Sequence, residues 1–466
     1  MTDAAPGSAA SPRRLAPPDI SIAGIAKLAS PMFIANVAVL GNVTIDTIMA
    51  GRLGAEDLAA VALGGAATGS IIMLLVGIIQ GLSPICGHHF GARRFERIGF
   101  EACQAAYIAA VLALIGIPLL CWTSFWTDLG QVSGRIAELT SLYLVFSAIS
   151  VPSGLINRIF VSVNAAISRP RTTMWISLIM LALKAPVNAV FMYGWLGVPA
   201  MGGAGAGVSN AIIYGLSTFL FAGAFLKDPA CRPMHPARWY APDFRALREQ
   251  LRIGIPIGLS VFFEVSSFTL MAIFISRLGA IAVSAHQIVS NIMATFYMIP
   301  LSIGLAASVL VAQSLGAGFP KVAETVSHRT LKIAVAIALT VSTALYFSSS
   351  FVIGIYTKEA EVAAVAGVII ACGVVYHPFD AVQAVCGFIL RGYRIAWFPM
   401  IVSGVALWCF GLGCGYRLGF YPTFLGDPMG PLGFWYGCTA GLILAAAALA
   451  AYALLHARKV AKAASA

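Results

Sequence analysis

Long apolar segments recur along almost the whole chain, and they restrict the folds open to it more than any other feature. Each is about 20 residues or longer, the length of an α-helix that crosses roughly 30 Å of hydrocarbon. They lack the alternation of polar and apolar residues that is typical of strands in an outer-membrane barrel. We therefore expect an all-α membrane protein whose twelve transmembrane helices cover residues 22–49, 58–86, 99–123, 137–157, 173–195, 205–226, 252–276, 282–312, 332–352, 362–390, 395–416 and 432–455.

The few charged residues are distributed unevenly between the two ends of these helices. Only 10% of the residues are charged, against roughly 25% in a soluble protein. If the helices alternate across the bilayer, 23 Lys and Arg residues fall on one side and 5 on the other, with Lys184 inside a helix. This bias follows the positive-inside rule and predicts a multi-pass protein of the bacterial inner membrane with both termini in the cytoplasm. It also explains the net charge of +11 without a nucleic-acid partner.

The two halves of the sequence resemble each other at a fixed offset. Residues 52–55 and residues 277–280 both read Arg-Leu-Gly-Ala, an offset of 225, and Pro31 and Pro256 share this offset. Two repeats of six helices enter the membrane from the same side, so a pseudo-twofold axis along the membrane normal should relate two six-helix bundles. The expected parts are a disordered tail 1–21, an N-lobe 22–226, a cytoplasmic linker 227–251, a C-lobe 252–456 and a C-terminal tail 457–466.

Three acidic residues, Asp46, Glu264 and Asp380, lie well inside predicted membrane helices. A charge at the bilayer centre costs at least about 2.5–3.5 kcal/mol, and such residues usually mark an ion or substrate path. The alternative is a packing or hydrogen-bonding role. Their counterparts in the other repeat are Met271, Val39 and Gly154. Because the repeat does not preserve these charges, we expect the lobes to have different roles.

The second half holds two of these acids in surroundings suited to a small cation. Tyr376 precedes Asp380 by four residues and so shares its helix face, and Pro378 frees a backbone carbonyl one turn earlier. Together with Glu264 these groups offer oxygen ligands for Na⁺, or a protonatable site if the coupling ion is H⁺. His377 would tune Asp380 or serve as a packed polar residue. The residues expected to line a cleft between the lobes are Phe262, Phe263, Gln287, Asn291 and His377.

The first half contains a basic residue, Lys184, inside a predicted helix. A buried ammonium group needs a counter-charge, and Asp46 is the one membrane-embedded acid predicted in that half. We therefore predict that Asp46 and Lys184 pair, and that they form with Asn188 a polar site that acts as a second gate or a structural lock.

Other classes of function lack support in the sequence. No Gly-Lys dipeptide exists, so the chain has no phosphate-binding loop that could hydrolyse ATP. No catalytic constellation stands out, and the nine cysteines lack metal-ligand spacing. We expect neither an enzyme nor a cofactor.

Several motifs resemble the multidrug and toxic compound extrusion family. Residues 46–54 (Asp-Thr-Ile-Met-Ala-Gly-Arg-Leu-Gly) resemble its first-repeat signature, and residues 285–288 (Ala-His-Gln-Ile) resemble the second-repeat counterpart. Residues 262–264 (Phe-Phe-Glu) and 380–383 (Asp-Ala-Val-Gln) resemble the NorM-type branch in particular.

The resemblance implies a twelve-helix exporter that expels cationic amphipathic drugs and dyes in antiport with Na⁺ or H⁺. We expect this exporter to be a monomer. It places Glu264, Asp380 and Tyr376 in the cation site and makes Asp46 an acid needed for transport. Lys184 departs from the family pattern, in which Asn is usual, and this favours coupling through the second lobe. The alternative is a lipid-linked precursor flippase of the same superfamily, whose pyrophosphate cargo would need several basic residues in the cleft.

Overall fold

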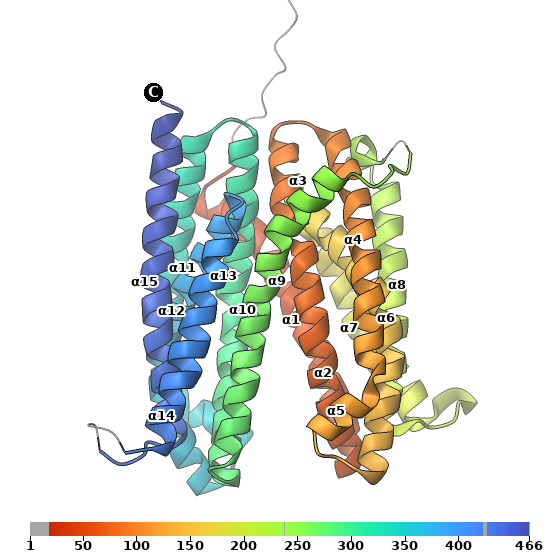
Figure 1. The fold of residues 1–466 in the computed structure, drawn as a ribbon, viewed down its shortest axis with the longest axis vertical. Helices are drawn as coiled ribbons and strands as arrows, with labels where there is room; N and C mark the ends of the chain where they lie inside the picture. The colour runs from red at the N-terminus through yellow and green to blue at the C-terminus, as the bar shows by residue number, and fades with distance from the viewer. Residues whose placement is uncertain (1–17, 237, 423–425, 466) are drawn as a thin grey trace, which may run out of the picture.

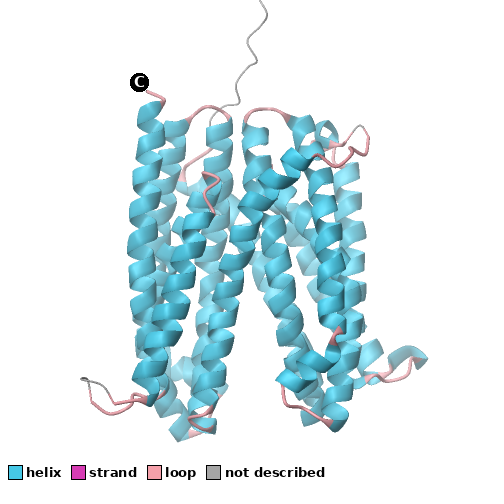
Figure 2. Ribbon diagram, in the orientation of Figure 1, coloured by secondary structure: helices cyan, strands magenta, loops and turns pink. Residues whose placement is uncertain are grey.

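The structure, a computed structural model, describes residues 18–236, 238–422 and 426–465. Its described residues contain twelve helices long and apolar enough to span a membrane, as predicted (Figures 1 and 2). Apart from three 3-10 turns, η1 (Trp195–Gly197), η2 (Gly202–Ala204) and η3 (Arg232–Met234), the elements in chain order are α1 (Ile22–Leu53), α2 (Ala55–Gln80) continued by α3 (Leu82–Gly91), α4 (Phe95–Cys121), the short α5 (Thr123–Leu129), α6 (Gly134–Ala166), α7 (Pro170–Tyr193), α8 (Gly205–Lys227), α9 (Phe244–Ser276), α10 (Ala280–Gly316), α11 (Pro320–Tyr356), α12 (Ala360–Gly392), α13 (Trp397–Gly404), the π-helical η4 (Val405–Cys414), α14 (Gly415–Phe420) and α15 (Pro431–Ala463).

Several helices are longer than their apolar segments. α9 begins at Phe244 instead of residue 252, α11 begins at Pro320 instead of residue 332, and α15 continues to Ala463. Hydropathy detects only the part of a helix that lies in hydrocarbon, whereas polar turns extend beyond it. The predicted N-terminal tail 1–21 falls mostly on residues 1–17, which lie outside the described residues.

The first turns of α9, which the sequence placed in a linker, pack on the first lobe. The Gln250 side-chain amide donates to the Glu101 carbonyl oxygen at 2.9 Å and to its carboxylate at 2.7 Å. Gln104 of α4 accepts a hydrogen bond from the Asp243 amide at 2.8 Å and donates to the Ala241 carbonyl at 2.9 Å. The segment between the lobes is therefore held against α4 at its end.

The spans form two bundles that meet at one end. We call the end that carries Ile22 and Ala463 the terminal end, and the end that carries Leu53 and Pro431 the loop end (Figure 1). Among the described residues, the hydrogen bonds between the bundles involve the helix halves nearer the terminal end, from Asn36–Ser302 near mid-membrane to Gln313–Ala166. Toward the loop end the ribbons of α2 and α9 diverge (Figure 1).

Glycines allow the two bundles to approach closely at the terminal end. A Cβ atom added to Gly77 would lie 2.7 Å from the Cα atom of Gly258, and one added to Gly81 would lie 2.8 Å from that of Gly254. A Cβ atom on Gly254 would in turn clash with the carbonyl oxygen of Ile78. Small residues permit this kind of backbone contact between membrane helices, where van der Waals packing drives association.

We predict that Gly254→Ala weakens this contact, because the added methyl group meets backbone that cannot rotate away. Overpacking of this kind costs about 1–3 kcal/mol, so the midpoint of thermal unfolding in detergent should fall. Gly223→Ala on α8 is the matched control, since its Cβ atom would meet nothing within 4 Å. Equal melting temperatures for the two variants would contradict the prediction.

Candidate functional site

The first lobe contains a buried ion pair in the half nearer the loop end. The Lys184 ammonium of α7 lies 2.9 Å from the Asp46 carboxylate of α1, and the Asn188 amide donates to the same carboxylate oxygen at 2.7 Å. Lys184 is 0% exposed and Asp46 is 6% exposed. Lys184 and Asn188 share one face of α7 because they are four residues apart. The pairing predicted from the sequence is therefore present.

Two further residues complete this network, Asn210 and Tyr143, and neither was predicted from the sequence. The Lys184 ammonium also donates to the Asn210 side-chain oxygen of α8 at 2.6 Å. The Asn210 amide nitrogen lies 3.4 Å from the Tyr143 hydroxyl of α6. A lone Asn in an apolar helix was the available signal, since amides in membrane helices usually bond across helices. The network joins four helices of the lobe.

We predict that Lys184→Met destabilises the protein by about 3–5 kcal/mol, because it leaves a buried carboxylate without its counter-charge. The double variant Asp46→Asn/Lys184→Met removes both charges and should recover most of this loss. Thermal unfolding of the purified variants measures both effects. Equal melting temperatures for the single and the double variant would contradict the prediction, because they would show that the unpaired carboxylate is not the cause of the lost stability.

The second lobe holds the other two acids on neighbouring elements. Asp380 and Tyr376 lie one turn apart on α12 and are both buried. Tyr376 packs edge-on against Trp435 of α15, with ring centroids 5.6 Å apart, and against Phe268 of α9 at 6.5 Å. These aromatic contacts hold the face of α12 that carries Asp380.

Glu264 of α9 lies close enough to Asp380 for the two carboxyl groups to interact electrostatically. The Tyr297 hydroxyl of α10 lies next to the Glu264 carboxyl group and also interacts with Asp380. The structure thus brings together Glu264, Asp380 and Tyr376, as predicted, and adds Tyr297. The one signal in the sequence for Tyr297 was its position within an apolar helix, three residues before Pro300.

Two arginines that were counted from the sequence on the side with the basic excess, Arg158 and Arg391, lie within helices near the terminal end and not in the loops that follow. Arg391 is in the last turn of α12, where its guanidinium stacks on the Phe388 ring at 4.3 Å and interacts with Glu264. Arg158 lies two turns before the end of α6, close enough to interact with Arg391. The long side chains reach inward from residues that hydropathy assigns to a helix end.

The residues predicted to line a cleft have different surroundings. Phe263 packs against Trp408 with ring centroids 5.9 Å apart, inside the second lobe, and Phe262 adjoins it. His377 is buried and packs on Phe296 at 6.1 Å. Gln287 and Asn291 are exposed and share one face of α10.

The groups around Glu264 and Asp380 offer few ligands for a multivalent metal. In the described part of the chain, no group of three or more His, Cys, Asp or Glu side chains could hold a metal ion. Two carboxyl groups, phenolic hydroxyls and backbone carbonyls suit a monovalent cation or a proton better. We keep Na⁺ at Glu264 and Asp380 as a prediction.

Comparison with known proteins identifies the family. The profile of the MatE family matches residues 31–190 and again residues 256–416, so it finds one copy in each half, at the offset seen in the sequence. The chain belongs to the MATE family. Proteins of this family are membrane transporters and not enzymes, and this MATE chain is a NorM-type, cation-coupled multidrug efflux antiporter, as the resemblance predicted.

Its relatives match it over nearly their full length. A probable multidrug resistance protein NorM of Aromatoleum aromaticum is 37% identical over 416 residues, which cover 89% of this chain and 90% of that protein. A NorM relative of Idiomarina loihiensis is 32% identical and covers 91% and 92%. Among solved structures, the eukaryotic MATE transporter AtDTX14 superposes with a TM-score of 0.84 at 21% identity, covering 94% of this chain and 98% of that one.

Proposed function

We propose that this MATE transporter couples export to a cation bound at Glu264 and Asp380 in the second lobe. The proposal rests on one difference between the lobes, which is whether the membrane-embedded acid has a basic partner. Asp46 has an ammonium partner at 2.9 Å. Within the described residues, neither Glu264 nor Asp380 has a Lys, Arg or His nitrogen within 4.0 Å. These two carboxyl groups therefore remain available to an incoming Na⁺ or H⁺.

Lys184 gives the first lobe a cation of its own. An ammonium group that also donates to Asn210 is fixed in place, so an external ion would have to displace it to reach Asp46. The first lobe then acts as a structural lock or a second gate, and the inward flow of cations is coupled through the second lobe.

Alternating access follows from the contact at the terminal end. With the bundles in contact there and apart toward the loop end, the coupling ion would enter from the loop end. To drive a change of state, the ion must bind one conformation better than the other. Binding at Glu264 and Asp380 would favour the conformation in which α9, α10 and α12 close around it and release the cargo.

The cargo would be a cationic amphipathic drug or dye. The membrane-embedded acids attract organic cations, and aromatic faces such as Phe262 and Phe268 bind cations through their quadrupoles. The curated relatives bear the name multidrug resistance protein NorM, which favours a drug over the lipid-linked precursor that the sequence left open. We further propose a monomer in the bacterial inner membrane with the terminal end in the cytoplasm.

We predict that Glu264→Gln and Asp380→Asn each reduce drug efflux at least tenfold, and that the double variant abolishes it. Proteoliposomes loaded with ethidium, under separately imposed Na⁺ and pH gradients, measure the loss and identify the ion. Glu361→Gln, an exposed acid in the first turn of α12, is the matched control and should transport normally. Full transport by the double variant would refute coupling at this site.

The proposed orientation predicts that green fluorescent protein fused after Ala466 is fluorescent, because that end would be cytoplasmic. Alkaline phosphatase inserted between α1 and α2, after Gly54, should be active because it would lie in the periplasm. The opposite pattern, a dark fusion with an inactive phosphatase, would show that the charge bias had been read in the wrong direction.

A further inference from the structure

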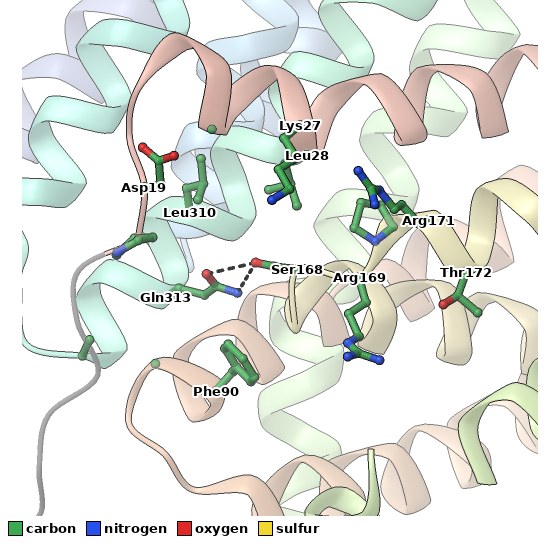
Figure 3. Close-up of a pocket in the computed structure, with 15 residues that line it drawn as sticks. Asp19, Lys27, Leu28, Phe90, Ser168, Arg169, Arg171, Thr172, Leu310 and Gln313 are labelled. Atoms are coloured by element: carbon green, nitrogen blue, oxygen red, sulfur yellow. Dashed lines mark hydrogen bonds between the residues drawn. The ribbon is translucent and has the colours of Figure 1, made fainter. Parts of the chain in front are cut away.

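A cavity of about 610 Å³ lies at the terminal end, where the two lobes meet. The first lobe contributes the start of α1 with Lys27, the turn between α6 and α7 with Ser168, and the start of α7 with Arg171. The second lobe contributes Gln313 of α10 (Figure 3). The volume is within the range of small-molecule sites, roughly 300–1,000 Å³, and no residue of the transport sites lines it.

The charges around this cavity favour an anion. Arg169 is engaged by Asp228 in an ion pair, whereas Lys27 and Arg171 have no carboxylate within 4.0 Å among the described residues. Asp19 is the one acid among the described residues of the lining. Its carboxylate accepts a hydrogen bond from the Ser21 amide at 2.9 Å, before the first turn of α1. Figure 3 shows Lys27 between Asp19 on one side and Arg171 on the other.

The beginning of α7 adds backbone donors to these cations. Pro170 is its first residue, and the N-cap residue Arg169 makes no side-chain hydrogen bond to the first turn. The first-turn amides of this 24-residue helix are therefore without a side-chain cap. The positive end of the helix dipole lies at this first turn, whose residues Pro170, Arg171 and Thr172 line the cavity. A guanidinium, an ammonium, a hydroxyl and the amides of this first turn together match the oxygens of a phosphate group.

Exposed apolar side chains on the two helices whose first turns line the cavity indicate that this phosphate belongs to a lipid. Trp175 is 61% exposed and lies four residues after Arg171, on the same face of α7. Ile22 is 69% exposed in the first turn of α1, and α1 packs against α7. Exposed tryptophans sit at the level of lipid headgroups, so acyl chains could follow these helices while the headgroup enters the cavity.

We propose that this cavity binds the phosphate headgroup of an anionic phospholipid, which bridges the two lobes and stabilises the conformation in which their terminal ends touch. The bridge depends on Gln313, whose amide donates across the lobes to the Ala166 carbonyl at 2.7 Å and to the Ser168 hydroxyl at 2.9 Å. Separation of the lobes would move Gln313 away from the cavity and so remove the side that the second lobe contributes. A ligand that binds one state better than the other shifts the population toward that state.

Binding to the purified full-length protein in detergent tests the proposal. Native mass spectrometry and thermal shift would compare dioctanoyl phosphatidylglycerol, dioctanoyl phosphatidylcholine and inorganic phosphate. We expect phosphatidylglycerol to bind at least tenfold more tightly than the other two. Lys27→Gln/Arg171→Gln should lose this preference. Lys227→Gln/Arg232→Gln removes the same charge from exposed positions outside the cavity and should retain it.

Three results would overturn the proposal. Unchanged phosphatidylglycerol binding by the Lys27/Arg171 variant would exclude the cavity. Inorganic phosphate that stabilises the protein as well as phosphatidylglycerol would exclude a lipid source. The third result comes from a measurement of conformation. Spin labels are attached to Gln131→Cys and Lys358→Cys, at the loop ends of the two lobes, after the exposed native cysteines have been replaced, and the distance between the labels is measured. Phosphatidylglycerol should increase the fraction with separated loop ends, and no change would refute the bridge. If the double variant does not fold, the two single variants serve instead, and none of these assays requires drug transport.

Discussion

Hydrocarbon does not solvate a charge or an unpaired backbone group, and the whole structure depends on this constraint. Because each unsatisfied backbone group in lipid costs several kcal/mol, the described spans are all helical. The same constraint directs polar side chains to the interior of the bundles. Lys184, 0% exposed, is stable there because Asp46 and Asn210 complete its contacts. A charged residue within the spans therefore needs either a nearby partner of opposite charge or a mobile ion that binds to it.

The two halves of the chain match the same family profile but differ in their electrostatics. In the first lobe a lysine neutralises the embedded acid, and the pair is tied to four helices. In the second lobe two acids and two tyrosines gather, and none of the basic side chains that the structure describes lies within 4.0 Å of either acid. Removal of one partner from a buried ion pair is costly, so the first lobe cannot readily exchange its cation. The second lobe can, and this difference underlies the proposed division of labour.

The contact at the terminal end has both a packing and an electrostatic component. Gly254 and Gly258 let α9 approach α2 closely, while Gln313 makes hydrogen bonds across the lobes. The cavity beside Gln313 exists because α1, α7 and α10 converge there. A lipid headgroup in that position would link the composition of the membrane to the conformational equilibrium of the transporter.

The sequence alone determined the features that depend on local composition. Apolar length predicted the twelve spans, internal repetition predicted two bundles, and the need to compensate a buried lysine predicted the Asp46–Lys184 pair. Only the tertiary structure decided which distant side chains meet. Tyr297 beside Glu264, Asn210 beside Lys184, and Arg391 reaching inward from a helix end follow from the rotation and crossing of helices. Hydropathy does not encode these quantities, because they result from the packing of side chains far apart in the chain.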